Sequence, residues 1–255
     1  FATAILTTDI VPKTVTTTLT LSSGVVRITG ISKGSGMIHP NMATMLGYIL
    51  TDAKLTVDQA QALISKTADV SFNMISVDGD TSTNDCCFLM ANGATGIELV
   101  TEADHQKFAA MIEDVAILLA KAIAADGEGA TKLMEVVIKG SDDLALAKKA
   151  AREITLSPLI KTAVHGEDPN WGRILARLGA AQIPSAQLAK MSLRLQGVLL
   201  FEKGQPVAFA RDEVKALLKQ FNVKIEIDLK SGKQVATAWG CDLSRKYVDI
   251  NTEYS

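Results

Sequence analysis

KGSGMIHPNMATML, residues 33–46, joins a glycine-rich loop to the start of an apolar segment that continues to residue 50. Its two glycines allow tight backbone turns, and its proline fixes one backbone angle shortly before the segment begins. The run 45–50 is short and apolar, which is typical of a buried strand. The stretch therefore predicts a strained loop that leads directly into an interior strand.

Strand and helix patterns lie on both sides of this loop. β-branched residues and alternation predict strands over 14–21 and 25–29, with a turn between them. Capping-box patterns begin at Thr56 and Thr101 and predict helices near 57–68 and 102–124. Other predicted elements are a buried strand 86–91, a strand 133–139, a helix 142–153 capped by Ser141, a helix 171–180, two strands over 191–209, a helix 211–221, and a hairpin of 223–229 with a last strand through 239.

This mixture of elements predicts an α/β fold of layered α+β type. The hairpins argue against a purely parallel sheet. The pattern of predicted elements changes near 145–158, which predicts a domain boundary there. Residues 1–155 would form one domain and residues 156–255 a smaller C-terminal α+β domain.

Composition excludes several classes of function. The net charge of −2 over 255 residues gives no electrostatic reason to expect nucleic acid or an anionic membrane as a partner. No apolar run reaches the length of a membrane span. Three cysteines, two of them adjacent at 86 and 87, form a poor disulfide framework and indicate a reducing compartment. Because the chain starts at Phe1 without an initiator methionine, we expect it to begin inside a longer gene product.

The bond between Ala43 and Thr44 is the candidate for chemistry. An internal threonine hydroxyl can attack the preceding carbonyl, and water then releases the ester. Thr44 would keep both a hydroxyl and a free α-amine, whose ordinary pKa of about 8 lets it accept the hydroxyl proton near neutral pH. A threonine at a strand start is ordinary by itself, so these residues alone favour a structural role.

Longer segments decide between these interpretations, because the chain resembles the ornithine acetyltransferase family along essentially its whole length. The resemblance implies an αββα sandwich of the N-terminal-nucleophile type for 1–155. It also implies a self-processing enzyme that moves an acetyl group from N2-acetylornithine to glutamate, with ornithine released, by a ping-pong route in arginine biosynthesis. The segments that carry it are 33–46, 71–85, 126–132, 165–175 and 247–254.

The resemblance also assigns roles to individual residues. Thr44 is similar to the catalytic nucleophile, and Ala43–Thr44 to the cleaved bond. Substrate contacts are implied for Thr44 and for Thr7, Lys33, Glu128 and Asn251. A lysine can pair with an α-carboxylate, and a glutamate with the distal ammonium of ornithine.

The resemblance further implies a cytoplasmic enzyme whose two chains, cut from one precursor, stay together as an α2β2 heterotetramer. It implies no metal and no organic cofactor. Some members of the family also accept acetyl-CoA, and the sequence leaves open whether this chain does. Members carry a further N-terminal segment with a Thr-Gly pair in the oxyanion hole and a threonine near the C-terminus, and we expect this chain to lack both.

Two other functions stay open. One is an N-terminal-nucleophile aminopeptidase or amidohydrolase, in which water replaces glutamate as the acceptor. The other is a non-catalytic assembly fragment. Two further segments favour structural roles: the acidic loop 78–85 as hydrogen-bond scaffolding, and 166–173 as a rigid interdomain corner. Cys86 and Cys87 are predicted to be inert core residues.

Overall fold

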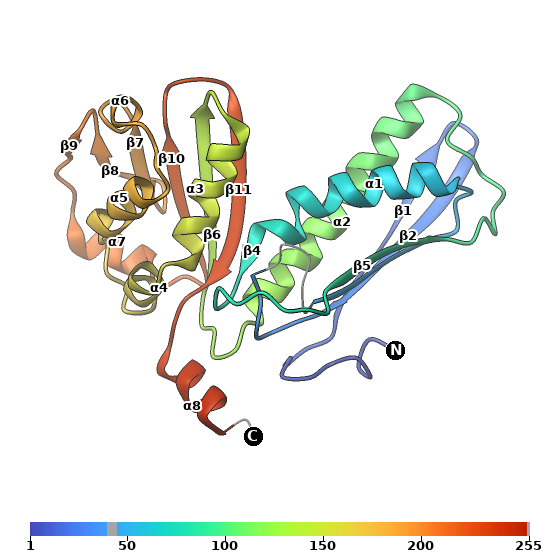
Figure 1. Cartoon of the computed structure of the whole chain (residues 1–255), viewed down its shortest axis with the longest axis horizontal. Coiled ribbons are helices and arrows are strands. Elements are labelled where there is room, and N and C mark those ends of the chain that lie inside the picture. The colour runs from blue at the N-terminus through green and yellow to red at the C-terminus, as the bar shows by residue number, and fades with distance from the viewer. Residues whose placement is uncertain (40–44, 254–255) are drawn as a thin grey trace. The chain divides into compact units, whose positions relative to one another are not determined.

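The computed structural model describes residues 1–39 and 45–253 (Figure 1). The chain divides into two compact units. Unit 1 comprises Phe1–Asn73 and Gly79–Asp126, and unit 2 comprises Met74–Asp78 and Gly127–Ser255.

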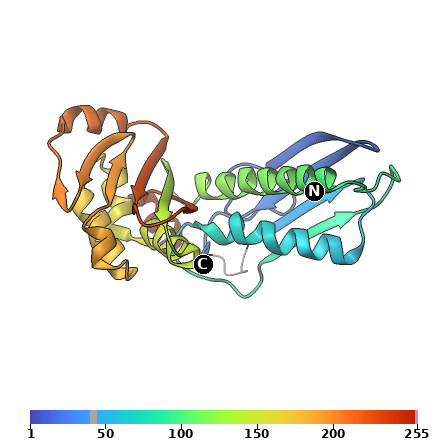
Figure 2. The ribbon, with the colours of Figure 1, turned by 90° about the horizontal axis from the view of Figure 1, so that it is seen from above.

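Unit 1 is a four-stranded sheet with helices α1 and α2 side by side along one face (Figures 1 and 2). β1 pairs antiparallel with β2, β2 antiparallel with β3, and β3 parallel with β5. The helices cover fully buried side chains such as Val26, Ile28 and Ile49. The elements are β1 (Lys13–Leu21), β2 (Gly24–Lys33), β3 (Leu46–Thr51), β5 (Cys86–Ala91), α1 (Val57–Val70) and α2 (Glu102–Ala125).

Both predicted capping boxes are confirmed. The side chains of Thr56 and Gln59 exchange hydrogen bonds with each other's backbone, and Thr101 and Asp104 do the same at the start of α2. Each box satisfies two backbone N–H groups that a helix start leaves without partners.

The predicted strand 86–91 is confirmed, but the prediction that it is buried is wrong. Phe88 is 45% exposed and Met90 54% exposed. Alternate residues of a strand point to opposite faces of its sheet, and these two point to the face that α1 and α2 do not cover.

Unit 2 is built on a seven-stranded sheet in the order β4-β11-β6-β10-β7-β8-β9. β6 is parallel to β10 and antiparallel to β11, and α3 packs against β6 and β11. The strands are β4 (Ile75–Ser76), β6 (Leu133–Ser141), β7 (Ser192–Leu195), β8 (Val198–Glu202), β9 (Gln205–Pro206), β10 (Asn222–Asp228) and β11 (Gln234–Cys241). The helices are α3 (Leu144–Leu156), α4 (Pro158–His165), α5 (Trp171–Ala180), α6 (Ser185–Leu188), α7 (Arg211–Leu217) and α8 (Arg245–Glu253), and a short 3-10 helix covers Phe72–Met74.

The predicted hairpin between 223–229 and the last strand is wrong, because β6 lies between β10 and β11. The turn crosses the end of β6, where the backbone N–H groups of Ser231 and Gly232 donate to the carbonyl of Gly140 at 2.7 and 2.8 Å. A Cβ on Gly232 would lie 2.3 Å from the Ser141 carbonyl oxygen, so the crossing requires glycine at this position.

Other boundaries in unit 2 also differ from the sequence predictions. The side chain that caps α3 is that of Asp143, which accepts from Ala145 and Leu146, while Ser141 ends β6. The two strands predicted over 191–209 are three, because a second turn separates β7 from β8.

The division between the units falls at Asp126/Gly127, whereas the predicted boundary was at 155/156. The difference has a packing cause. β6 and α3 lie within the predicted first domain by sequence, but they pack with β10 and β11 in unit 2. None of the helices in the described ranges is long and apolar enough to cross a lipid bilayer.

Candidate functional site

Unit 1 holds the loop that follows Lys33 at the end of β2. Gly34 has φ +152°, and a Cβ there would lie 2.9 Å from the side chain of Ile38. Ile38 is fully buried, and so is Met45 on the other side of the loop. The loop is therefore held tightly where it leaves β2 and where it enters β3. The predicted cleavage bond and nucleophile, Ala43 and Thr44, lie outside the described residues.

Thr7 and Lys33 are tied to one carboxylate, that of Asp9. The backbone N–H of Thr7 donates to Asp9 Oδ2 at 3.3 Å. The backbone N–H of Gly34, the residue after Lys33, donates to Asp9 Oδ1 at 2.7 Å. Asp9 thus links the backbone of Thr7 to the backbone next to Lys33.

Asp85 is a residue that sequence reasoning assigned only to scaffolding. It precedes β5, and the N–H of Cys86 donates to the carbonyl of Met45 at 3.0 Å, so Asp85 lies beside the start of β3. Among residues 1–39 and 45–253, neither buried carboxylate oxygen of Asp85 has a hydrogen-bond partner. An acidic residue directly before an apolar strand was the available sequence signal.

Burial controls the charge of Asp85. It raises the pKa of this carboxyl to about 7, while the backbone of Met45 and the positive charge of Lys33 act in the opposite direction. The carboxyl group of Asp85 therefore titrates close to neutral pH. The positive charge of Lys33, a predicted substrate contact, influences its pKa.

Cys87 is the other perturbed group in this sheet. Burial raises the pKa of its thiol to about 12, and Cys86 adds to the rise. A thiol this weakly acidic is a poor nucleophile, which supports the prediction of an inert residue.

Unit 2 holds the other two predicted contacts. Glu128 lies in the loop that follows α2 and is 9% exposed, and Asn251 lies on α8. Asn251 Nδ2 donates to Glu128 Oε2 at 2.8 Å and to the Tyr247 carbonyl at 2.9 Å. The fold therefore brings together two side chains that are 123 positions apart in the sequence.

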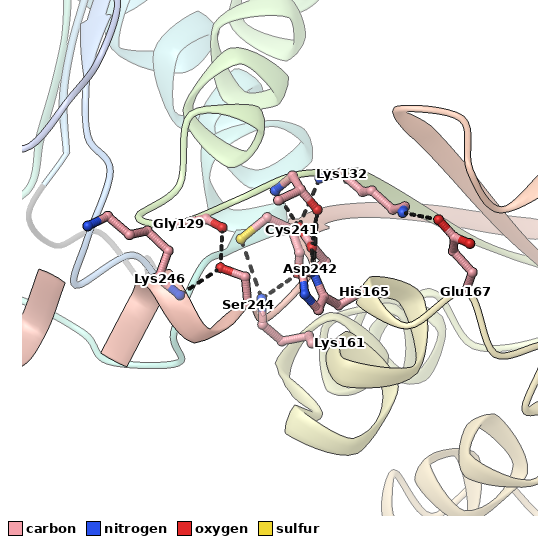
Figure 3. A network of polar contacts seen from close by, with 10 residues as sticks. Gly129, Lys132, Lys161, His165, Glu167, Cys241, Asp242, Ser244 and Lys246 are labelled. Atoms are coloured by element: carbon pink, nitrogen blue, oxygen red, sulfur yellow. Dashed lines mark hydrogen bonds and ion pairs between the residues drawn. The ribbon is translucent and has the colours of Figure 1, made fainter. Parts of the chain in front are cut away.

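The loop of Glu128 is fixed to the start of α8. Gly129 has φ +69°, and a Cβ there would lie 2.5 Å from the backbone nitrogen of Tyr247. Ser244 Oγ donates to the Gly129 carbonyl at 2.6 Å and accepts from the backbone N–H of Lys246 at 3.2 Å. Figure 3 shows Ser244 between these two residues. Sequence reasoning missed Ser244, because its role depends on a contact across 115 positions.

A second polar network in unit 2 surrounds Asp242. Its carboxylate accepts from the backbone N–H groups of Thr131 and Lys132 at 2.7 and 2.8 Å, from Thr131 Oγ1 at 2.5 Å, and lies 2.7 Å from His165 Nδ1. Burial by itself would raise the pKa of Asp242, but these hydrogen bonds lower it below its ordinary value. Close by, Lys161 Nζ donates to the Cys241 carbonyl at 2.5 Å (Figure 3).

Segment 166–173, predicted as a rigid interdomain corner, connects α4 to α5 within unit 2. His165 contacts Asp242, and Arg211 pairs with Asp168 at 2.6 Å. Arg173 Nη1 donates to the Leu159 carbonyl at 2.5 Å. These bonds support the structural role predicted for the segment.

Unit 1 carries a glycine-rich loop between β2 and β3, and unit 2 carries a pair in which the exposed Asn251 bonds to the buried Glu128. Both units mix helices with strands, as in a layered α/β fold. The chain belongs to the ArgJ family, whose sequence pattern matches residues 1–255.

Known proteins agree with this assignment. The chain is 44% identical to the arginine biosynthesis bifunctional protein ArgJ of Oceanobacillus iheyensis, over 100% of this chain and 63% of that protein. It is 46% identical to arginine biosynthesis bifunctional protein ArgJ 1 of a Nostoc species, over 99% of this chain and 63% of that protein. The chain thus spans less than two thirds of the length of these relatives.

A solved structure is also similar. The crystal structure of the arginine biosynthesis bifunctional protein ArgJ from Bacillus halodurans matches with a TM-score of 0.79 and 38% sequence identity, covering 83% of this chain and 100% of that chain. The predicted layered α/β fold is confirmed by this similarity and by the two sheets described above.

Proposed function

We propose that this chain forms the larger part of a self-processing acetyltransferase of arginine biosynthesis. In this proposal an acetyl group passes from N2-acetylornithine to Thr44 and then to glutamate. The observation that carries it is the Glu128–Asn251 pair, in which two residues at positions implied for substrate contact meet at 2.8 Å. The names of the relatives, arginine biosynthesis bifunctional proteins, support the same pathway.

Processing comes first in this mechanism. The Thr44 hydroxyl attacks the carbonyl carbon of Ala43, the bond from that carbon to the Thr44 nitrogen breaks, and the nitrogen takes the hydroxyl proton. Water then hydrolyses the new ester and leaves a free α-amine on Thr44. That amine accepts the hydroxyl proton in each later cycle, which is the threonine form of an activated nucleophile.

Transfer follows in two balanced steps. The Thr44 oxygen attacks the acetyl carbonyl of acetylornithine, the carbon–nitrogen bond breaks, and ornithine leaves with the proton. The amine of glutamate then attacks the acetyl carbon, the bond from that carbon to the Thr44 oxygen breaks, and the oxygen regains a proton that the amine gives up. The acetyl group is carried as an ester, so neither step requires ATP, a metal or an organic cofactor.

Charge complementarity suggests the orientation of the substrate. Lys33 suits the α-carboxylate that donor and acceptor share, and buried Glu128 suits the distal ammonium of ornithine. Asn251 holds Glu128 through one carboxylate oxygen and leaves the other to accept from a ligand.

The test uses the intact gene product, acetylornithine labelled in its acetyl group, and glutamate. Labelled acetylglutamate formed only when glutamate is present is the expected result. Labelled acetate formed at the same rate with and without glutamate would identify an amidohydrolase instead. A protein that neither cuts itself nor releases label would be an assembly fragment. Light scattering of the cut protein tests the proposed α2β2 assembly.

A further inference from the structure

A buried ion cluster in unit 1 joins three segments that are distant in the sequence. Lys13, the first residue of β1, is 3% exposed. Its ammonium donates to Asp9 Oδ1 at 2.7 Å, to Asp126 Oδ2 at 2.6 Å and to the Val11 carbonyl at 3.3 Å. The three protons of the ammonium are therefore all used.

The two carboxylates of the cluster bind backbone groups as well as Lys13. Besides the bonds to Thr7 and Gly34 described above, Asp126 Oδ2 accepts from the N–H groups of Ile10 and Val11 at 3.0 and 3.4 Å. Asp126 is also the C-cap residue of α2, and its carbonyl accepts from Ser35 Oγ at 2.7 Å. The cluster thus joins the loop before β1, the loop after β2 and the end of α2.

Hydrogen bonds favour the charged form of Asp9. Burial would raise the pKa of Asp9, but hydrogen bonds from Lys13 and from the backbone of Gly34 lower it below its ordinary value. Removing one partner of a buried ion pair leaves an uncompensated charge, which is strongly destabilising. The charges therefore favour the arrangement in which the three side chains stay in contact.

The location of the cluster argues for more than stability. The core of unit 1 is apolar between α2 and the sheet. The ions lie instead at the strand ends, and the backbone groups they bind include those of Thr7 and of the residue after Lys33.

We propose that Asp9, Lys13 and Asp126 are positioning residues that hold Thr7 and Lys33 in the geometry that binds the amino-acid part of the acetyl donor. The proposal rests on the proposed function. None of the three is a catalytic residue, because each acts through the backbone or the charge of another residue.

The first experiment compares Asp9→Asn with Lys13→Met in the intact, processed enzyme. Asp9→Asn leaves Lys13 paired with Asp126, so the remaining pair is charge-balanced and the fold is expected to persist. We expect the KM for acetylornithine to rise about tenfold or more in both variants, with a smaller change in kcat, because ground-state contacts are misplaced.

Asp104→Asn is the matched control. Asp104 is also a buried carboxylate in unit 1, but it holds Ser22 and Thr101 at the start of α2, whereas Asp126 lies at the end of that helix. The control should lower Tm without changing KM. If Asp9→Asn and Lys13→Met also lower Tm and leave KM unchanged, the cluster only stabilises the fold and the proposal is overturned.

Amide hydrogen exchange of residues 7–11 and 33–36 provides a readout that does not depend on catalysis. Faster exchange in these segments of Asp9→Asn, with the β1–β2 ladder still protected, is the expected result. Unchanged exchange would refute the positioning role even if KM rises. If the unmutated enzyme transfers no acetyl group, the proposed function fails, and so does the claim that the cluster positions substrate contacts. The exchange measurement then still shows whether the cluster orders residues 7–11 and 33–36.

Discussion

Four of the five substrate contacts implied by the resemblance lie in the described residues, and they are held in two different ways. In unit 1, the backbone N–H groups of Thr7 and of Gly34, the residue after Lys33, donate to Asp9, which pairs with the buried Lys13. In unit 2, Glu128 and Asn251 contact each other directly through their side chains. Substitutions in unit 1 should therefore act by displacing backbone, whereas substitutions in unit 2 should act on the charge and reach of the contact itself.

Glu128→Gln tests this difference with the largest expected effect. Glutamine can still accept the hydrogen bond from Asn251, so the variant removes the charge and keeps the pairing. We expect kcat/KM for acetylornithine to fall about 100-fold, because a hydrogen bond to a charged group is lost from a buried site. Steady-state kinetics measures the change, with Glu226→Gln as control, because Glu226 is a partly exposed glutamate of β10 that pairs with Lys224. An unchanged kcat/KM would remove Glu128 from substrate binding.

Ser244→Ala should have an intermediate effect. The hydroxyl joins the Glu128 loop to the start of α8, and its loss leaves the half-buried Gly129 carbonyl without this donor. We expect KM for acetylornithine to rise about fivefold to tenfold, since one neutral hydrogen bond contributes about 1 kcal/mol. Ser231→Ala removes a comparable bond, to the Leu229 carbonyl, and should leave KM unchanged. Equal KM values for the two variants would mean that Ser244 does not position Glu128.

Asp85→Asn has the smallest expected effect, and it tests a carboxylate of unit 1 whose pKa is raised by burial, whereas that of Asp9 is lowered. The folded-state pKa of Asp85, about 7, lies above the ordinary pKa of 3.8 of an aspartate, so the folded protein binds more protons than the unfolded chain between these values. Stability is therefore lost as pH rises from about 4 to about 7, and the neutral variant avoids this loss.

At pH 8 we expect Asp85→Asn to be more stable than the unmutated protein by about 1 kcal/mol, after allowance for the water that reaches this half-buried group. The advantage should vanish near pH 4. Urea unfolding at both pH values measures it, beside Asp114→Asn at an exposed site on α2. A variant that is less stable than the unmutated protein at pH 8 would show that the charge of Asp85 is stabilised in the fold.

Local signals in the sequence predicted local structure well. The capping boxes at Thr56 and Thr101 fixed two helix starts, because all of their partners lie within three residues. Strand order was not predictable in this way. β6 lies between β10 and β11 through pairings across many positions, and alternation within a strand does not reveal its neighbours.

The candidate site shows the same limit. Motifs implied Thr7, Lys33, Glu128 and Asn251, yet they did not reveal that Asp9 links the first two. Lys13 and Asp9 have the spacing of an ordinary surface pair, and only the fold buries them against Asp126. Thr44, the centre of the proposed chemistry, lies outside the described residues and depends on experiment.

The most direct test of the account is the intact mass of the purified gene product beside its Thr44→Ala variant, before and after incubation with acetylornithine. We predict two fragments that meet at Ala43/Thr44, an uncut variant, and an added acetyl mass on the fragment that begins with Thr44, removed again by glutamate. A single uncut mass for the unmutated protein, or cut fragments that never gain an acetyl group, would contradict the account.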